Sequence, residues 1–107
     1  MKLIQCIVRP GKLEDLVRAL SPVISGMTAR EIRTAGAEGA WHAIYRGVEY
    51  QALTPRVLID IVTDESWVDD IIRIVAETAK TGESGDGFIH IMPVEGSYHV
   101  RTGFMDV

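Results

Sequence analysis

The sequence predicts an α+β sandwich in which one antiparallel sheet carries two helices on a single face. Two observations support this prediction: each half of the 107-residue chain reads strand, helix, strand, and both helical segments have one apolar side. A duplicated unit of this kind is typical of the ferredoxin-like βαββαβ arrangement. At this length we expect residues 1–107 to form a single domain.

The first half begins with an apolar strand at residues 2–9, which ends at Pro10 and Gly11. A helix is predicted next, because apolar side chains recur there at the spacing of one helical face. These side chains are Leu13, Leu16, Val17 and Leu20. Pro22 ends the helix, since proline lacks the backbone donor. A second strand at residues 28–35 is expected chiefly because the repeat requires it.

The second half carries the stronger pattern. Branched residues at 56–62 predict a strand, and Thr63 is expected to cap the helix that follows. This helix has a wide apolar stripe at helical periodicity and ends near Lys80. The stripe consists of Val68, Ile71, Ile72, Val75, Ala76 and Ala79. A strand at residues 88–92 and a short extended piece at residues 98–101 complete the pattern.

The predicted strands are apolar on both faces. One face presents Ile4, Cys6, Val8, Val57, Ile59 and Ile61, and the opposite face presents Leu3, Ile7, Leu58 and Val62. Two helices cover one face, so the other face needs a ligand or a further subunit. We therefore expect a homo-oligomer.

Composition and charge exclude several classes of protein. Hydrophobic residues make up 47% of the chain and charged residues 24%, which is globular usage. A net charge of −4 gives no electrostatic reason to expect nucleic acid as a partner. No segment approaches the roughly 20 apolar residues that span a bilayer. Because Cys6 is the sole cysteine, no intrachain disulfide can form, and a cytoplasmic location is expected.

The run TGESGDG at residues 81–87 is the most informative stretch, because three glycines lie between the second helix and the last strand. Few side chains shield its backbone N–H groups, which are therefore able to surround an anion. The run is neither a Walker A loop nor a G-x-G-x-x-G dinucleotide motif. A helix cap followed by a tight turn explains the glycines equally well on turn chemistry alone.

A long connection, residues 36–54, joins the two halves without helical or strand periodicity. Loops of this size in compact domains are usually functional or disordered. Its large side chains favour a protruding partner-binding loop. They are Trp41, His42, Tyr45, Arg46 and Tyr50. The alternative is a β-hairpin with Tyr45 and Tyr50 as ordinary strand residues.

Taken in order, these motifs resemble the PII signal-transduction proteins, the trimeric nitrogen regulators, along essentially the whole chain. Residues 2–13 are similar to the family's opening strand, and residues 26–28 to its turn into the second strand. Residues 45–50 (YRGVEY) resemble the tip of its mobile T-loop, and residues 81–88 its nucleotide-binding B-loop. Residues 96–107, which contain the run Arg-Thr-Gly, resemble its C-terminal loop.

The resemblance implies a homotrimer whose clefts between subunits bind ADP, AMP or ATP, with magnesium as a possible companion. One subunit would contribute Ile7, Gly36, Glu38 and Arg56 to each cleft. The next would contribute Gly26, Met27, Thr28, Asp60, Val62, Gly85, Gly87, Phe88, His99 and Arg101. Gly85 and Gly87 would present backbone donors to the phosphates, and Arg101 a charge-assisted contact. The nucleotide would select among T-loop conformations without covalent chemistry, which describes a regulator and not an enzyme.

Three residues depart from the family pattern. Where typical members have a glutamine that helps to hold magnesium and 2-oxoglutarate, this chain has Glu38, whose carboxylate could hold a metal ion but repels the acidic effector. A response to 2-oxoglutarate is therefore doubtful. Phe88 replaces a phosphate-binding lysine, and His99 replaces an arginine. With fewer cations facing the phosphates, ADP or AMP is expected to compete better against ATP than in typical members.

The loop residues leave several interpretations open. Tyr50 matches a tyrosine that some bacterial relatives have uridylylated, although unmodified members carry it too. Arg46 matches the arginine that ammonium-channel regulators insert into the pore, and its alternative is a solvated loop residue. A relative that responds to another small anion, such as bicarbonate in carbon fixation, is an alternative to nitrogen control. A small ferredoxin-like enzyme with an apolar cavity is a second alternative.

Other chemistry has little support in the sequence. The histidines at 42, 90 and 99 show no metal-ligand spacing, and Cys6 has no cysteine partner. His90 is expected to share a strand face with Phe88 and Met92, as a satisfied buried or half-buried side chain.

Overall fold

The computed structural model describes residues 1–35, 42–45, 48–51 and 53–106 of the chain. Its strands are β1 (Lys2–Val8), β2 (Thr28–Thr34), β3 (His42–Tyr45), β4 (Val48–Gln51), β5 (Thr54–Thr63) and β6 (Gly87–Pro93). Its helices are α1 (Leu13–Leu20) and α2 (Val68–Ala79), and the single 3-10 turns η1 (Pro10–Lys12) and η2 (Glu65–Trp67) precede them.

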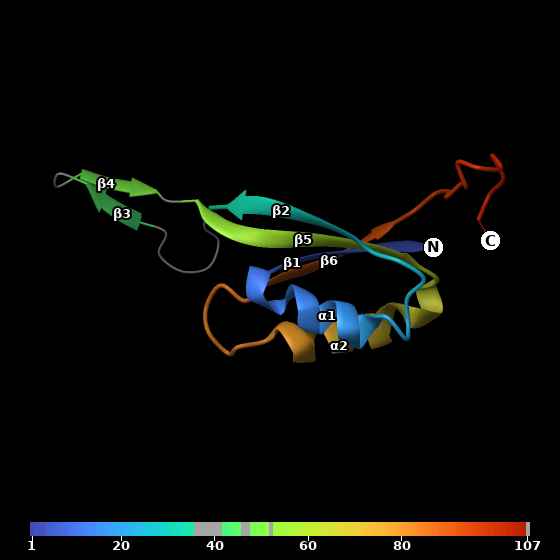
Figure 1. Cartoon of the computed structure of the whole chain (residues 1–107), viewed down its shortest axis with the longest axis horizontal. Helices are drawn as coiled ribbons and strands as arrows, with labels where there is room; N and C mark the ends of the chain where they lie inside the picture. The colour runs from blue at the N-terminus through green and yellow to red at the C-terminus, as the bar shows by residue number, and fades with distance from the viewer. Residues whose placement is uncertain (36–41, 46–47, 52, 107) are drawn as a thin grey trace.

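Four of these strands form one sheet in the order β2-β5-β1-β6, and every neighbouring pair is antiparallel. Strand β1 is central: it pairs with β5 from Lys2↔Thr63 to Val8↔Val57 and reaches β6 at Val8↔Gly87. Both helices lie on the same face of the sheet (Figure 1). The predicted ferredoxin-like βαββαβ sandwich is therefore confirmed.

Side chains from β1, β5 and the two helices fill the space between sheet and helices. The core consists of Ile4, Cys6, Val8, Leu16, Leu20, Val57, Ile59, Ile61, Ile71, Val75 and Ala79, none more than 6% exposed. The helical stripes are narrower than predicted, because Val17 is 45% exposed and Ala76 also faces solvent. In the part of the chain that the structure describes, no helix is long and apolar enough to cross a membrane.

The strand ends differ from the sequence prediction by one or two residues, and β5 begins at Thr54, inside the expected loop. The helix cap and the C-terminal segment also differ. Thr63 ends β5, and the N-cap is Asp64, whose carboxylate accepts a hydrogen bond from the Ser66 N–H at 3.3 Å. A carboxylate at this position accepts from the first turn and complements the helix dipole, so it outcompetes the threonine before it. The expected extended piece at residues 98–101 is instead a turn, closed by an isolated bridge between Tyr98 and Met105.

The sheet face away from the helices is apolar, as the alternation predicted. Val62 is 41% exposed, Phe88 43% and Met92 36%, and the half-buried side chains of Leu3 and Ile7 lie between them. This open face is defined by those residues together with Leu58 and His90. A polar row of Asp60, Gln5 and His90 crosses the middle of this face, with apolar side chains on both sides of it. Exposed apolar side chains gathered on one face are typical of a surface that another molecule covers. The homo-oligomer that would cover this face stays a prediction.

The long connection between the halves contains paired strands. β3 and β4 are antiparallel, from His42↔Gln51 to Tyr45↔Val48, and they extend beyond the end of the sheet where β5 begins (Figure 1). The hairpin alternative is therefore correct for the backbone of these residues. The role of the hairpin in binding a partner stays a prediction.

Truncation of Ile71 to alanine should lower the free energy of unfolding by about 2 to 5 kcal/mol, because its side chain is fully buried in the core. The Val17→Ala variant should lose less than about 1 kcal/mol of unfolding free energy, since Val17 is 45% exposed. Urea unfolding followed by circular dichroism measures both. Equal losses in the two variants would contradict the placement of the core.

Candidate functional site

The expected nucleotide-binding residues that the structure describes fall into two groups at opposite ends of the sheet. One group surrounds the glycine loop, residues 81–87, beside the start of β5 at Arg56. The other surrounds the end of β5 at Val62, together with the α1–β2 connection and the chain's C-terminal segment. Arg56 and Val62 lie six residues apart on β5, which corresponds to roughly 20 Å at the strand rise.

The glycine loop closes around its own carboxylate. Oδ2 of Asp86 accepts hydrogen bonds from the backbone N–H groups of Thr81 at 2.9 Å and Gly82 at 3.0 Å. Oδ1 accepts from the Thr81 hydroxyl, whose oxygen in turn accepts from the Glu83 N–H at 3.1 Å. The first N–H groups of the loop, which the sequence left available for a ligand, are therefore occupied within the loop itself.

These hydrogen bonds keep Asp86 charged. The bond from the Thr81 hydroxyl, followed by that from the Thr81 N–H, holds the pKa of Asp86 well below its ordinary value of 3.8. Smaller contributions to the low pKa come from the Gly82 N–H and from Arg9. Asp86 is thus a fixed negative charge inside the loop at every pH near neutrality.

Two arginines from neighbouring strands hold the outer side of the loop. Nε of Arg9 donates to Asp86 Oδ1 at 3.3 Å, and its Nη2 donates to the Ser84 carbonyl at 2.8 Å. Arg56 is 9% exposed and donates from Nη2 to the Gly85 carbonyl at 3.3 Å. Burial first, and the Arg9 charge second, lower the pKa of Arg56, but a guanidinium remains charged at neutral pH.

Glycine is required at two positions of the loop by geometry. Gly85 has φ +91°, and a Cβ there would lie 3.2 Å from Arg56 Nη2. Gly87 has φ +121°, and a Cβ added at this position would lie 1.7 Å from the carbonyl oxygen of Ile7 on β1. The loop therefore lies against the sheet at a distance that no side chain permits.

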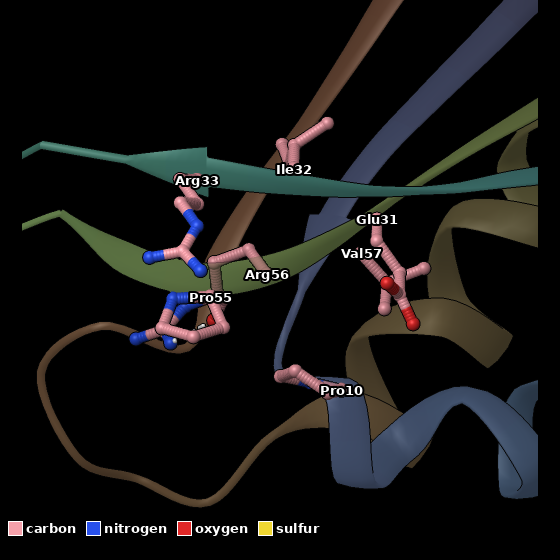
Figure 2. A pocket seen from close by; sticks show the side chains of 7 residues that line it. All are labelled: Pro10, Glu31, Ile32, Arg33, Pro55, Arg56 and Val57. Atoms are coloured by element: carbon pink, nitrogen blue, oxygen red, sulfur yellow. Dashed lines mark hydrogen bonds between the residues drawn. The ribbon is translucent and has the colours of Figure 1, made fainter.

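Beside this loop, a pocket of about 600 Å³ opens between η1, β2 and β5 (Figure 2). Its lining residues are Pro10, Glu31, Ile32, Arg33, Pro55, Arg56 and Val57. Arg33 reaches from β2 toward Pro55, its register partner on β5, and toward Arg56. The lining contains two guanidinium groups and one carboxylate, so its net charge is positive and the pocket suits an anion.

The second group lines a smaller pocket, of about 400 Å³, at the other end of the sheet. Its lining residues are Ser25, Gly26, Met27, Thr28, Asp60, Val62, Ser97 and Asp106. Asp60 is held by Gln5 Nε2 at 3.1 Å and by Arg30 Nη2 at 3.3 Å. The pocket thus presents a positioned carboxylate beside small and apolar residues.

The C-terminal segment folds back beside this pocket. The Gly103 N–H donates to the His99 carbonyl at 2.7 Å, and the Asp106 N–H donates to the Ser97 carbonyl at 2.7 Å. His99 Nε2 lies 3.4 Å from Asp106 Oδ1. Arg101 is exposed on the turn. The turn therefore leaves Arg101 available for contacts outside its own chain.

The structure corrects the expected division of residues between subunits. Gly85, Gly87 and Phe88 were assigned to the subunit that provides Gly26, but they lie beside Arg56 and Ile7 of the same chain. The cause is the register of β1 and β6, which pairs Val8 with Gly87 and Ile7 with Phe88. The glycine loop and the first strand therefore belong to the same half of any cleft.

Some expected site residues lie outside the described part of the chain. These are Gly36, Glu38, Trp41 and Arg46. His42, Tyr45 and Tyr50 lie in the backbone of β3 and β4. His90 is exposed on the open face, where its ring stacks on Phe88 at a centroid distance of 6.0 Å. It shares that face with Phe88 and Met92 as predicted, but in this single chain it is not buried.

Sequence reasoning missed three residues of the loop assembly: Arg9, Thr81 and Asp86. Arg9 and Asp86 are 77 positions apart in the chain, so no local pattern connects them. Thr81 and Asp86 flank Gly82 and Gly85, and a Thr–Asp pair around such a glycine run is a signal for a side chain that closes the turn. In the described residues, no group of three or more His, Cys, Asp or Glu side chains is arranged to hold a metal ion.

The Gly87→Ala variant should lose about 2 to 4 kcal/mol of unfolding free energy, because it combines positive φ with a clash against the Ile7 carbonyl. Gly82→Ala is the matched variant: its φ is +87°, but nothing lies within 4 Å of the added Cβ. It should lose about 1 to 2 kcal/mol from backbone strain alone. Chemical denaturation measures both, and equal losses would show that the close approach to Ile7 is unimportant.

The contribution of Asp86 to stability should depend on pH in one direction. Its pKa is lower in the folded state than the ordinary value of 3.8, so the folded state is stabilised above that value and loses this contribution as the pH falls below it. The difference in unfolding free energy between wild type and Asp86→Asn should therefore be constant near neutrality and shrink below about pH 4. A difference that grows on acidification would contradict the assignment.

The chain matches known proteins over nearly its whole length. The family profile described as nitrogen regulatory protein P-II covers residues 1–104. Nitrogen regulatory protein P-II of Haemophilus influenzae is 40% identical over 105 residues, which cover 96% of this chain and 94% of that protein. That of Pasteurella multocida is 42% identical over the same shares. Nitrogen regulatory protein GlnK of Escherichia coli is 38% identical over 108 residues, covering 99% and 96%. The chain therefore belongs to the P-II family of nitrogen regulatory signal-transduction proteins, which are regulators and not enzymes.

Proposed function

We propose that this chain forms a homotrimer, binds adenine nucleotides in the clefts between subunits, and uses the bound nucleotide to control a target-binding loop at residues 36–54. The observation that supports this proposal is the separation of the site residues into two groups at opposite ends of one sheet. Neither group alone combines the glycine loop with the residues around Asp60.

A second copy of the chain would bring the two groups together. Both groups border the open face, where apolar side chains such as Val62 and Phe88 are exposed to water in the single chain. Burying them against another subunit would be favourable. A neighbouring subunit whose sheet packs against this face can place its own Asp60 end beside the Arg56 end of the first. A closed ring then repeats the same cleft at each interface, which is how one chain provides several equivalent sites.

The residues have complementary roles in this cleft. The glycine loop, with Gly85 and Gly87, would receive the phosphates, while Arg101 from the neighbour would add a charged donor and His99 a ring N–H donor. Gly26, Met27 and Thr28 form a lining of small and apolar residues suited to an adenosine. Magnesium would be held by nucleotide phosphates and a carboxylate such as Glu38.

The charge balance of the cleft favours the shorter nucleotides. Phe88 occupies the first position after Gly87 and lies on the open face. Because its ring is uncharged, it provides no positive charge to attract the phosphates. We therefore propose that ADP or AMP competes well against ATP in this chain. The carboxylate at Glu38 repels a dicarboxylic effector, so 2-oxoglutarate should not strengthen nucleotide binding.

The target-binding surface is proposed to be the loop that carries Trp41, His42, Tyr45, Arg46 and Tyr50. The backbone hairpin of β3 and β4 extends beyond the sheet (Figure 1). Aromatic residues and arginine, which the sequence of this loop contains, dominate contacts between proteins. A membrane transporter such as an ammonium channel is the proposed class of target. Tyr50 is the proposed site if the loop is covalently modified.

A cytoplasmic location fits the chemistry of the cysteine. Cys6 is fully buried, and its burial first, with Asp60 second, raises the pKa of the thiol to about 11. A thiol of this kind is unreactive and needs no oxidising compartment.

Light scattering and calorimetry together test the proposal. The particle mass should be three times the 11.8 kDa of the chain, with one class of nucleotide site per subunit. ADP, AMP and ATP with magnesium should each release heat on titration, and ADP should displace ATP at comparable concentration. Adding 2-oxoglutarate should leave these affinities unchanged. A monomer, or a trimer that binds none of the three nucleotides, would contradict the proposal.

A further inference from the structure

The glycine loop contains an anion of its own. Four donors converge on the two oxygens of Asp86: the Thr81 and Gly82 N–H groups, the Thr81 hydroxyl and the Arg9 Nε. Each carboxylate oxygen accepts two of these bonds. The side chain of Asp86 thus occupies, at the start of the loop, the position that a bound anion would take in an empty glycine-rich turn.

Arg9 connects this arrangement to the sheet. Its guanidinium bonds to the Asp86 carboxylate and, at 2.8 Å, to the Ser84 carbonyl, so it spans two points of the loop from the end of β1. The two side chains are 29% and 25% exposed, which keeps the pair partly shielded from water. Arg9 and Asp86 therefore fix the distance between the loop and the strand beside it.

A loop with three glycines is costly to hold in one conformation. Glycine loses more backbone entropy on ordering than any other residue, and a ligand that had to order the loop would bind more weakly by that cost. Hydrogen bonds within the loop offset this loss of backbone entropy when the chain folds. A loop fixed in advance binds more tightly than a loop that the ligand has to organise.

We propose that Asp86 is a positioning residue, which holds the glycine loop in the conformation that receives the nucleotide phosphates. This inference rests on the proposed nucleotide function. Two effects of Asp86 oppose each other, since its negative charge repels phosphates while its hydrogen bonds fix the loop. Positioning prevails because the carboxylate is already compensated by Arg9 at 3.3 Å, with the Arg56 guanidinium on the same side of the loop.

Substitution Asp86→Asn separates these two effects. All four groups around the carboxylate are donors, so an amide must direct its NH₂ toward at least one of them and release part of the loop. Positioning predicts about tenfold weaker ADP binding, which corresponds to the loss of about one or two hydrogen bonds. Charge repulsion alone predicts tighter binding, because a negative charge has been removed from the neighbourhood of the phosphates.

The matched control is Glu83→Gln, which removes one charge from the same loop and leaves the backbone N–H of Glu83 in place. It should bind ADP at least as tightly as wild type. Thr81→Ser keeps the hydroxyl that donates to Asp86 and should bind like wild type, whereas Thr81→Val removes it and should bind several-fold more weakly. The threonine pair tests the same network without changing any charge.

Calorimetric titrations with ADP and with adenosine distinguish positioning from general damage, with the mass and thermal unfolding of each variant measured alongside. Positioning requires that Asp86→Asn weakens ADP and leaves adenosine unchanged, because adenosine has no phosphate for the loop to receive. Equal or tighter ADP binding by Asp86→Asn overturns the inference and leaves the nucleotide function intact. Equal weakening of both ligands, or loss of the assembly, overturns it in favour of a structural role. Wild-type protein that binds no nucleotide overturns both proposals.

Discussion

A sheet that is apolar on both faces and covered by helices on one is the constraint on which the other features of this chain depend. β1 and β5 lie at its centre, and their alternation sends Ile4 and Ile59 into the core while Ile7 and Leu58 point to the opposite face. Ile4 and Ile59, which point to the helices, are at most 1% exposed, whereas Val62 on the other face is 41% exposed. The first set stabilises the single chain, and the second would provide the driving force for the proposed association with further copies.

The antiparallel order of the strands also determines where chemistry is available. Since β1 pairs with both β5 and β6, the end of β1 at Val8 meets the start of β6 at Gly87 and the first part of β5 at Val57. The glycine loop must therefore pass close to the Ile7 carbonyl, which excludes any Cβ at Gly87. At the opposite end, the return of the chain from α1 and its C-terminal segment meet the end of β5. Two pockets at opposite ends of one sheet follow directly from this topology, and the proposed assembly would bring one of each kind together.

Most of the fold, but less of the site, could be predicted from the sequence. Strands and helices with long periodic patterns were placed correctly, because burial imposes those periods. The hairpin of β3 and β4 was the less favoured alternative, since strands of four residues give almost no alternation to detect. The cap at Asp64 was placed one residue early, because threonine and aspartate both cap helices.

The partnership of Arg9 with Asp86 was not predictable, because it depends on strand register between distant segments. The same register determines which expected residues share one half of a cleft.

The position after Gly87 shows how one substitution can redistribute charge and apolar surface. By alternation along β6, Phe88 points to the open face, where its ring stacks on His90 at an interplanar angle of 7°. A lysine at this position, as the family resemblance leads one to expect, would place a cation at the border between the glycine loop and the open face. Phe88 instead extends the apolar surface available to a neighbouring subunit. The positive charge around the loop then resides in Arg9 and Arg56, both of which hold loop carbonyl groups. In this chain Arg9 and Arg56 therefore hold the loop's backbone as well as placing positive charge beside it.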